Sequence, residues 1–330
     1  MLHAIRNSNG KATLCSRYVK TYKYNVEKQA GAQVIPNVFS GFNGVTASVA
    51  RGALTAFRVL AGQYNPVNGN GLANTSLAFF CNRLFALGES DLPYAVRLTD
   101  TGDIETIGRF DFDGKLEMSM TAHPKTDPQT GDTFAFRYSP VPPFLTFFRF
   151  DSTGKKQRDV PVYSLTSPSF VHDFAITKRH AIFAEIQIVM RMNIMDLVLE
   201  GGSPVGADNR KTPRLGVIPR YAGDDSEMKW FEVPGFNIIH AINAWDDRFD
   251  RSERYVHRAY VREDGSRSRL GGEGEDRSRH RYRDTSSDLR EEPRFRGDQS
   301  GVSRETEPLR VRGNRRSDAE DLRSGESRRE

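Results

Sequence analysis

Short runs of alternating apolar and polar residues between positions 76 and 190 predict β-strands. Residues 94–98 alternate, residues 133–138 alternate strictly, and residues 104–112 and 144–150 are rich in aromatic and β-branched side chains. The runs are separated by turn sequences in which an Asp comes shortly before a Gly. These turn sequences lie at 99–103, 111–114, 127–132 and 151–155.

The turn sequences narrow the choice of architecture. Asp accepts turn geometry, and Gly accepts the positive φ that many tight turns require. Short strands with regular turns are typical of a sandwich, a barrel or a propeller. Because the Asp-x-x-Gly turns recur, they favour repeated antiparallel hairpins and therefore an all-β propeller. The repeat is too degenerate to give the number of blades.

Residues 44–61 break the strand pattern and predict a short helical insertion with one apolar face. One interpretation is a helix that packs on the sheet. The other is a helix that lies in a lipid surface, with Phe57 and Leu60 dipping into it and Arg51 and Arg58 reaching back to the headgroups. The apolar positions that recur on one face are Val49, Ala53, Phe57 and Leu60.

The composition changes abruptly near Asp247. Residues 248–330 contain 22 Arg, no Lys, 19 acidic residues and only five aromatic residues. A segment of this kind buries too little apolar area to offset its ordering entropy. We therefore expect a globular domain over residues 1–247 and a disordered, Arg-rich C-terminal tail over residues 248–330. The overall formal charge of +5 marks no single basic face.

The two cysteines and the N-terminus exclude several classes of protein. Cys15 and Cys81 lie far apart in apolar contexts, so they predict free thiols in a reducing compartment rather than a disulfide framework or a thiolate metal site. No apolar run reaches membrane-spanning length. The first six residues predict a strand, and we expect neither a secretory signal nor a transit peptide in this chain.

Three histidines stand in apolar, strand-like runs: His123, His172 and His240. Their spacing alone is weak evidence for a metal site, because lone histidines on strands are usually hydrogen-bonded structural residues. A second interpretation is chemically coherent. Imidazoles that point inward from separate propeller blades could converge on the axis and bind a divalent first-row metal.

Six local sequences, in this order along the chain, resemble those of the carotenoid cleavage dioxygenases. The resemblance runs from the first residues to about Asp247, and residues 81–87 and 235–240 look most like the plant plastid type-four subfamily. The six sequences are Glu-Ser-Asp-Leu-Pro-Tyr (89–94), Ile-Gly-Arg-Phe-Asp-Phe-Asp-Gly (107–114), Thr-Ala-His-Pro-Lys-Thr-Asp-Pro (121–128), Val-His-Asp-Phe-Ala-Ile-Thr (171–177), Gly-Val-Ile-Pro-Arg-Tyr-Ala (216–222) and His-Ala-Ile-Asn-Ala-Trp (240–245).

The resemblance implies a seven-bladed propeller, only partly covered by this chain, with Fe(2+) on its axis. Four histidines hold the iron in the family, and His123, His172 and His240 stand where the first three stand. Glu89 stands where a glutamate orients a ligand imidazole by holding its other ring nitrogen; the alternative for Glu89 is a solvated loop acid. No catalytic side chain beyond the metal site is implied, and no flavin, nicotinamide or haem.

By the same resemblance, the expected activity is that of an oxidoreductase that incorporates O2 into a single donor. The family splits a conjugated double bond of a carotenoid or apocarotenoid, typically at the 9,10 or 9′,10′ position, and gives two carbonyl products. The resemblance also implies a plastid location, in the chloroplast stroma or at plastoglobules. Peripheral contact with a plastid membrane would fit the lipid interpretation of residues 44–61.

The resemblance ends at about Asp247, and no sequence with the fourth histidine follows. An Arg-rich, Lys-free tail is what an out-of-frame reading or an aberrant splice product would give. We therefore expect this chain to be inactive, with a non-catalytic fragment or a carotenoid-binding remnant as alternatives to the dioxygenase. Residues 266–269 and 277–281 resemble a nucleic-acid-binding arm, but the interspersed acids nearly cancel the charge, so nucleic acid is a disfavoured partner.

Overall fold

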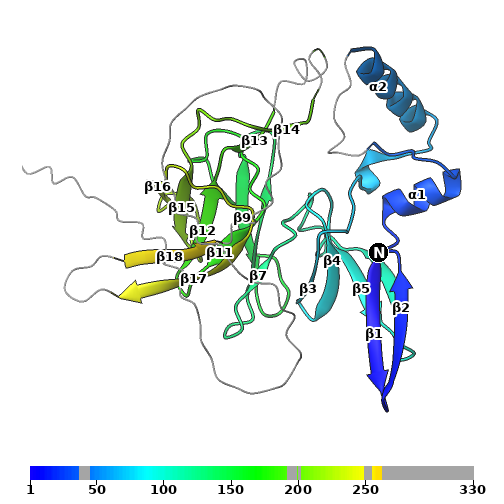
Figure 1. The fold of residues 1–330 in the computed structure, drawn as a ribbon, viewed down its shortest axis with the longest axis horizontal. Coiled ribbons are helices and arrows are strands. Elements are labelled where there is room, and N and C mark those ends of the chain that lie inside the picture. Colours follow the sequence, from blue (N-terminus) through cyan, green and yellow to red (C-terminus); the bar gives the residue numbers. More distant parts are fainter. Residues whose placement is uncertain (37–44, 192–198, 200–201, 249–254, 262–330) are drawn as a thin grey trace, which may run out of the picture.

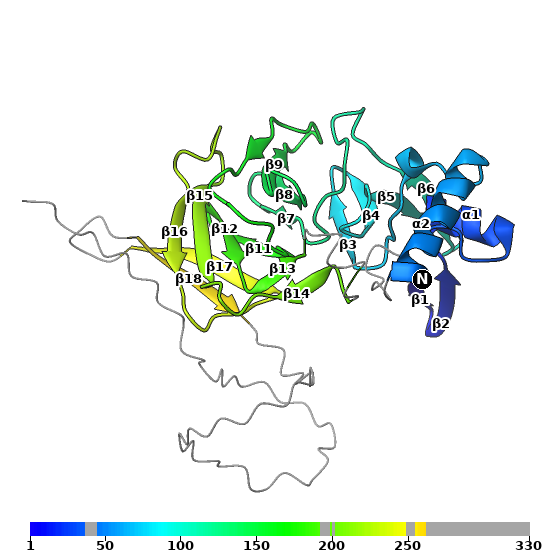
Figure 2. The ribbon, with the colours of Figure 1, turned by 90° about the horizontal axis from the view of Figure 1, so that it is seen from above.

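Three four-stranded antiparallel sheets follow one another along the chain and form the body of the molecule (Figure 1). The structure is a computed structural model that describes residues 1–36, 45–191, 199, 202–248 and 255–261. Figure 2 shows the three sheets side by side in chain order. Four-stranded antiparallel sheets arranged in this way are the units of which propeller blades are made.

Each sheet is built almost entirely from strands that are neighbours in sequence. The first sheet has the order β3 (Ser76–Phe80), β4 (Arg83–Leu87), β5 (Tyr94–Leu98), β6 (Ile104–Arg109). The second has the order β10 (Val160–Pro161), β9 (Leu145–Phe150), β8 (Thr133–Tyr138), β7 (Lys125–Thr126). The third has the order β11 (Phe174–Ile176), β12 (His180–Glu185), β15 (Arg214–Pro219), β16 (Lys229–Glu232).

The remaining elements are two-stranded ribbons and short helices. At the N-terminal end (blue in Figure 1), helix α1 lies close to the hairpin β1–β2, and helix α2 lies farther from it. The ribbon β13–β14 interrupts the third sheet, and β17–β18 follows it. These elements are β1 (Leu2–Ser8), β2 (Lys11–Arg17), α1 (Tyr22–Ala30), α2 (Val45–Leu60), the 3-10 helix η1 (Pro66–Asn68), β13 (Ile188–Met190), β14 (Val205–Ala207), β17 (Ala241–Arg248) and β18 (Tyr255–Val261).

Phenylalanine-rich cores fill the spaces between successive sheets. Side chains alternate across a strand, so neighbouring residues of β8 and β9 face different cores. Phe136 and Phe147 pack with Phe174 and Phe183 of the third sheet. Their neighbours Ala135 and Phe148 belong instead to the core shared with the first sheet, which also contains Phe80, Phe85, Phe112 and Phe150. The second sheet is therefore packed on both faces.

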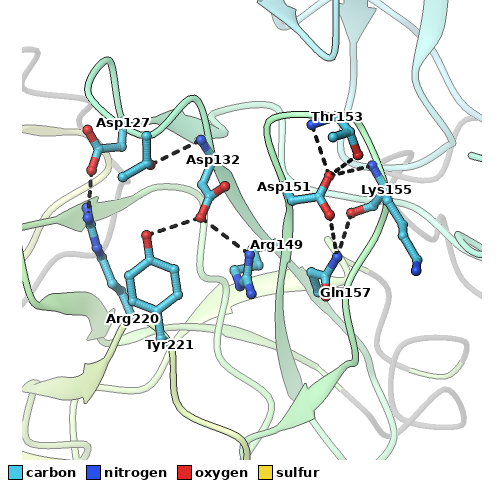
Figure 3. Close-up of polar contacts among 10 residues, drawn as sticks. Asp127, Asp132, Arg149, Asp151, Thr153, Lys155, Gln157, Arg220 and Tyr221 are labelled. Carbon is cyan, nitrogen blue, oxygen red and sulfur yellow. Dashed lines mark hydrogen bonds and ion pairs between the residues drawn. The ribbon is translucent and has the colours of Figure 1, made fainter.

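Polar contacts also tie the second sheet to the third (Figure 3). The Arg220 guanidinium, directly after β15, lies 2.6 Å from Asp127 in the turn between β7 and β8. Its neighbour Tyr221 donates its hydroxyl hydrogen to Asp132 at 3.1 Å. In a different turn, the carboxylate of Asp151 accepts hydrogen bonds from the backbone N–H groups of Thr153 and Lys155. The Asp-containing turns therefore close hairpins and join sheets.

The strands predicted at 94–98 and 133–138 are confirmed residue by residue as β5 and β8. The strand predicted over 104–112 ends earlier, at Arg109. Phe112 and Asp113 adopt φ values of 56° and 60°, a left-handed turn conformation that interrupts a strand. The all-β class with few helices is also confirmed. The number of blades stays a prediction.

Helix α2 confirms the predicted helical insertion over its described residues, but the interpretation that it packs on the sheet does not hold. None of its residues is buried. Phe57 and Leu60 are 62% and 87% exposed. The helix instead contacts the segment after α1, where Arg58 donates to the carbonyl oxygens of Gln33 and Val34. No helix in the described parts of the chain is long and apolar enough to cross a membrane.

Where the structure describes the expected tail, its residues lie in strands, and the first of them, Arg248, ends β17. Residues 255–261 form β18, which pairs antiparallel with β17. Their sequence, Tyr-Val-His-Arg-Ala-Tyr-Val, is rich in aromatic and β-branched residues, which favour strands. The rest of the expected tail, 249–254 and 262–330, lies outside the described residues. The division of the chain at Asp247 stays a prediction.

Replacing Phe183 by Ala should lower the free energy of unfolding by about 3–5 kcal/mol, because the ring is fully buried against three other phenylalanines. Urea denaturation followed by circular dichroism measures the change. Phe79→Ala is the matched control, since this ring is 66% exposed and its loss should change stability by less than about 0.5 kcal/mol. Equal losses in the two variants would contradict the packing described above.

Candidate metal centre

The three histidines occupy equivalent places in successive sheets. His123 lies two residues before β7, His172 two residues before β11, and His240 directly before β17. The sequence predicted them within strand-like runs; the structure places them just before the strands begin. β7 and β11 are edge strands of their sheets, and β17 contacts β11. The starts of these strands meet, and the three imidazoles meet with them.

The imidazole rings face one another in a triad. The Nε2 atoms of His123 and His172 are 3.1 Å apart. The three ring centroids are separated by 4.7, 4.9 and 4.9 Å, and each pair of rings is close to perpendicular. One possible ligand atom from each residue lies within 4.8 Å of the others. His123 and His172 are half-buried, whereas His240 is exposed.

Glu89 and Tyr138 support the ring of His172. Oε1 of Glu89 lies 2.6 Å from Nδ1 of His172, although the approach is bent from the ideal hydrogen-bond direction and neither atom has another polar partner in the part of the chain described. Tyr138 of β8 donates its hydroxyl hydrogen to Oε2 of Glu89 at 3.1 Å. Glu89 is therefore held between a strand of the second sheet and an imidazole of the triad, and is not a solvated loop acid.

A glycine fixes the backbone that carries Glu89. At Gly88 the chain passes so close to the carbonyl oxygen of Leu72 that a Cβ atom would lie 1.8 Å from it. No side chain can be accommodated at this distance unless the backbone moves. The close approach therefore constrains the position of the next residue, Glu89.

The electrostatics of the site favour a neutral ring at His123. Burial, together with the neighbouring His172, His240 and Lys125, lowers the pKa of His123, and the Asp173 carboxylate opposes this effect. The neutral imidazole is the form that binds metals. Burial and the adjacent Glu89 raise the pKa of Tyr138, so its hydroxyl group remains a hydrogen-bond donor to that carboxylate.

These residues fit a first-row divalent metal. Imidazole nitrogens bind such metals at about 2.0–2.1 Å, so two of them at a right angle are separated by roughly 3 Å. The observed 3.1 Å between the Nε2 atoms of His123 and His172 agrees with this spacing. The contact between Glu89 and Nδ1 of His172 leaves Nε2 directed at the triad. A carboxylate in this place fixes the tautomer and the aim of a metal-binding histidine.

The other histidines lie elsewhere. Nδ1 of His3 is 2.8 Å from the Ser16 hydroxyl in the β1–β2 hairpin, and Nδ1 of His180 is 3.2 Å from Asp246. His257 belongs to β18, and His280 lies outside the described residues. The structure therefore brings together His123, His172, His240 and Glu89, as expected, and leaves His3 and His180 apart from them.

The sequence analysis did not identify three residues that contact the triad or its supporting carboxylates. These residues are Lys125, Tyr138 and Asp173. Lys125 and Asp173 were visible in the His-Pro-Lys and His-Asp sequences, each within two residues of a triad histidine. Their side chains form an ion pair of 2.7 Å, buried on the Asp173 side. Tyr138 carries no local signal, because it reaches Glu89 from 49 residues away in sequence.

Comparisons with known proteins agree with this geometry. The profile of the family described as retinal pigment epithelial membrane protein matches residues 1–320. The chain is 87% identical over 247 residues to the probable carotenoid cleavage dioxygenase 4, chloroplastic, of Arabidopsis thaliana. The aligned residues cover 75% of this chain and 42% of that protein. The chain is 39% identical over 249 residues to carotenoid 9,10(9′,10′)-cleavage dioxygenase 1 of the same plant, with coverage of 75% and 45%.

A solved structure shares the fold. The lignostilbene dioxygenase of Pseudomonas brassicacearum superposes with a TM-score of 0.58 at 27% identity, covering 77% of this chain and 48% of that one. In each of these comparisons the chain spans less than half the length of its relative.

The triad should bind one Co(2+) per chain, and replacing any one of its histidines by Ala should weaken binding more than about 10-fold, since even outer partners of metal ligands are worth that much. Titration followed by the visible absorption of bound Co(2+) measures the affinity. His3→Ala, which changes a histidine far from the triad, should bind as the unchanged protein does. Equal affinity in His172→Ala and the unchanged protein would remove that ring from the site.

Proposed function

Because this chain belongs to the carotenoid cleavage dioxygenase family, a family of oxygenase enzymes, we propose that its histidine triad holds Fe(2+). The single observation that carries the proposal is the convergence of His123, His172 and His240 from the starts of β7, β11 and β17, with Glu89 against one ring. When bound, the iron supplies the activation of O2 for cleavage of a carbon–carbon double bond.

The residues of the chain prepare and aim the ligands. Burial keeps the His123 ring neutral, so a nitrogen lone pair is available without the loss of a proton. Glu89 holds Nδ1 of His172 and thereby directs Nε2 inward. Tyr138 fixes Glu89 through its hydroxyl hydrogen, and its own position is set by β8. These contacts restrict the orientation of the imidazole rings before a metal binds, so that little conformational freedom is lost on binding.

We propose a carotenoid or apocarotenoid as the substrate, with O2 as the second reactant and cleavage at the 9,10 or 9′,10′ bond. The products would be an apocarotenoid aldehyde or ketone and its partner fragment. Support comes from the six family sequences and from the relative whose name specifies this bond. A polyene has no charged group to recognise, so apolar side chains must position the reacting bond relative to the metal.

The complete site in this proposal is a seven-bladed propeller with four histidine ligands. Three of them are present in the described residues, and the chain spans 42% of its 87% identical relative. We infer that a polypeptide of these 330 residues binds the metal but turns over slowly by itself. Carotenoid binding without cleavage is the alternative function for such a polypeptide.

The polypeptide loaded anaerobically with Fe(2+) and supplied with O2 should give little or no aldehyde or ketone from β-carotene or an apocarotenal. By the family resemblance, one of four ligand histidines and two of three orienting carboxylates have no counterpart in this chain, and each such carboxylate is worth roughly 10–100-fold. Liquid chromatography with mass spectrometry identifies the products and the bond cleaved, and a full-length relative is the positive control. Turnover comparable to that of the relative would show that three imidazoles suffice.

We further propose a plastid location, supported by the chloroplastic name of the 87% identical relative, and peripheral contact of α2 with a lipid surface. The helix exposes Val49, Leu54, Phe57 and Leu60. An exposed apolar helix face with arginines at its border is typical of helices that lie in a membrane interface. Such contact would place the protein where apolar substrates dissolve.

Changing Phe57 and Leu60 together to Ser should lower binding to liposomes more than about 10-fold, since each buried apolar side chain contributes roughly 1.5–3 kcal/mol. Co-flotation with vesicles of plastid-type galactolipids measures the bound fraction. The matched control changes Phe79 and Leu77 of β3 to Ser, because these side chains are also exposed but belong to the first sheet. Equal losses in both double variants would argue against α2 as the contact.

A further inference from the structure

Asp173 joins the three segments that carry the histidine triad. Its Oδ1 atom lies 2.7 Å from the ammonium nitrogen of Lys125, two residues after His123. Its Oδ2 atom accepts a hydrogen bond of 3.0 Å from the backbone N–H of Ala241, directly after His240. Asp173 itself directly follows His172. A single carboxylate therefore contacts the start of β7 and the start of β17 from the start of β11.

The carboxylate is positioned rigidly. Its side chain is 3% exposed, and Oδ1 also accepts the backbone N–H of Phe174 at 2.7 Å. Lys125 is held in turn, since its ammonium group lies 5.9 Å from the centre of the Phe174 ring. A buried carboxylate with three polar partners resists displacement, because moving it would leave charged and polar groups unpaired.

We propose that Asp173 is a positioning residue that sets the separation of the three histidine-bearing segments and so the geometry of the metal site. This inference rests on the proposed function, because the main measurement that tests it is the binding of a metal by the triad. It does not require Asp173 to touch the metal or the substrate. Because Asp173 contacts Lys125 and the Ala241 backbone, a movement at the start of β7, β11 or β17 also moves the other two imidazoles.

Glu185 offers a matched comparison. Its side chain is also 3% exposed, and its carboxylate contacts Lys211 at 2.7 Å and Arg214. Lys211 and Arg214 lie far in sequence from the triad histidines, and a third partner, the Ser167 hydroxyl at 3.3 Å, lies five residues before His172. In the described residues, no hydrogen bond or ion pair of Glu185 reaches a residue within two positions of a triad histidine. Loss of the Glu185 charge should therefore cost stability through the same burial effect without moving the imidazoles.

The first experiment compares Asp173→Asn, Lys125→Met and Glu185→Gln in the full chain by Co(2+) titration, with urea unfolding of each variant. Asp173→Asn should bind Co(2+) about 10-fold more weakly or worse and shift the visible absorption of the bound ion, because the angles between ligands change. Lys125→Met should also weaken Co(2+) binding and should shift the visible absorption in the same direction. Glu185→Gln should keep the affinity and spectrum of the unchanged protein.

An unchanged Co(2+) affinity and spectrum in folded Asp173→Asn would overturn the proposal, as would equal effects in Glu185→Gln. If Asp173→Asn does not fold, Lys125→Met is used instead, since it removes only the ion pair between Asp173 and the segment that carries His123. An unchanged Co(2+) affinity and spectrum in Lys125→Met would then overturn the proposal. An unchanged protein that binds no Co(2+) would refute the proposed metal function rather than the positioning role.

In that last case, hydrogen exchange of the metal-free protein tests Asp173 by itself. Asp173→Ala should speed exchange in peptides that contain the Ala241 amide at least about 10-fold, while peptides from β12 keep the rate of the unchanged protein. An Ala241 amide that exchanges at the same rate in both proteins would show that the link to the third segment does not exist.

Discussion

The packing of phenylalanine rings between successive sheets determines where the metal-site residues can lie. Because β8 and β9 send alternate side chains to opposite faces, the second sheet is fixed against both neighbours at once. Protein cores transmit displacements, since they are close-packed. This packing holds the second and third sheets together, and the Nε2 atoms of His123 and His172, which precede β7 and β11, lie 3.1 Å apart.

Against this apolar framework, the triad is a small polar region with charges of both signs around it. Burial and the adjacent imidazoles and Lys125 disfavour a proton on His123, while Asp173 favours one. The result is a ring that remains neutral, because its pKa is lowered and the proton is lost at lower pH than usual. Glu89 lies against a different ring and is itself held by a tyrosine. Charges of both signs lie within a few residues of the triad without a net excess that would repel a divalent cation.

How much of this arrangement the sequence could reveal depends on the range of each interaction. Local patterns located β5, β8 and α2, because alternation and helical periodicity are properties of adjacent residues. They missed the end of β6, where Phe112 and Asp113 enter a left-handed conformation that non-glycine residues seldom adopt. The exposure of α2 could not be read from its apolar face either, since periodicity shows that a face exists and not what covers it.

The triad itself was found through the resemblance of short sequences, because its members are 49 and 68 residues apart and spacing gave no signal. The supporting contacts are of a different kind. Each of the three sheets contains a buried carboxylate or lies beside one. Asp91, beside the first sheet, accepts from Leu92, Tyr94, Arg109 and Gly71, all within 20 residues of it. Asp173 differs because its partners come from segments 48 residues before it and 68 after it. A carboxylate with local partners stabilises one hairpin, whereas a carboxylate with partners in three segments constrains their relative placement, and only the folded chain shows which kind an aspartate is.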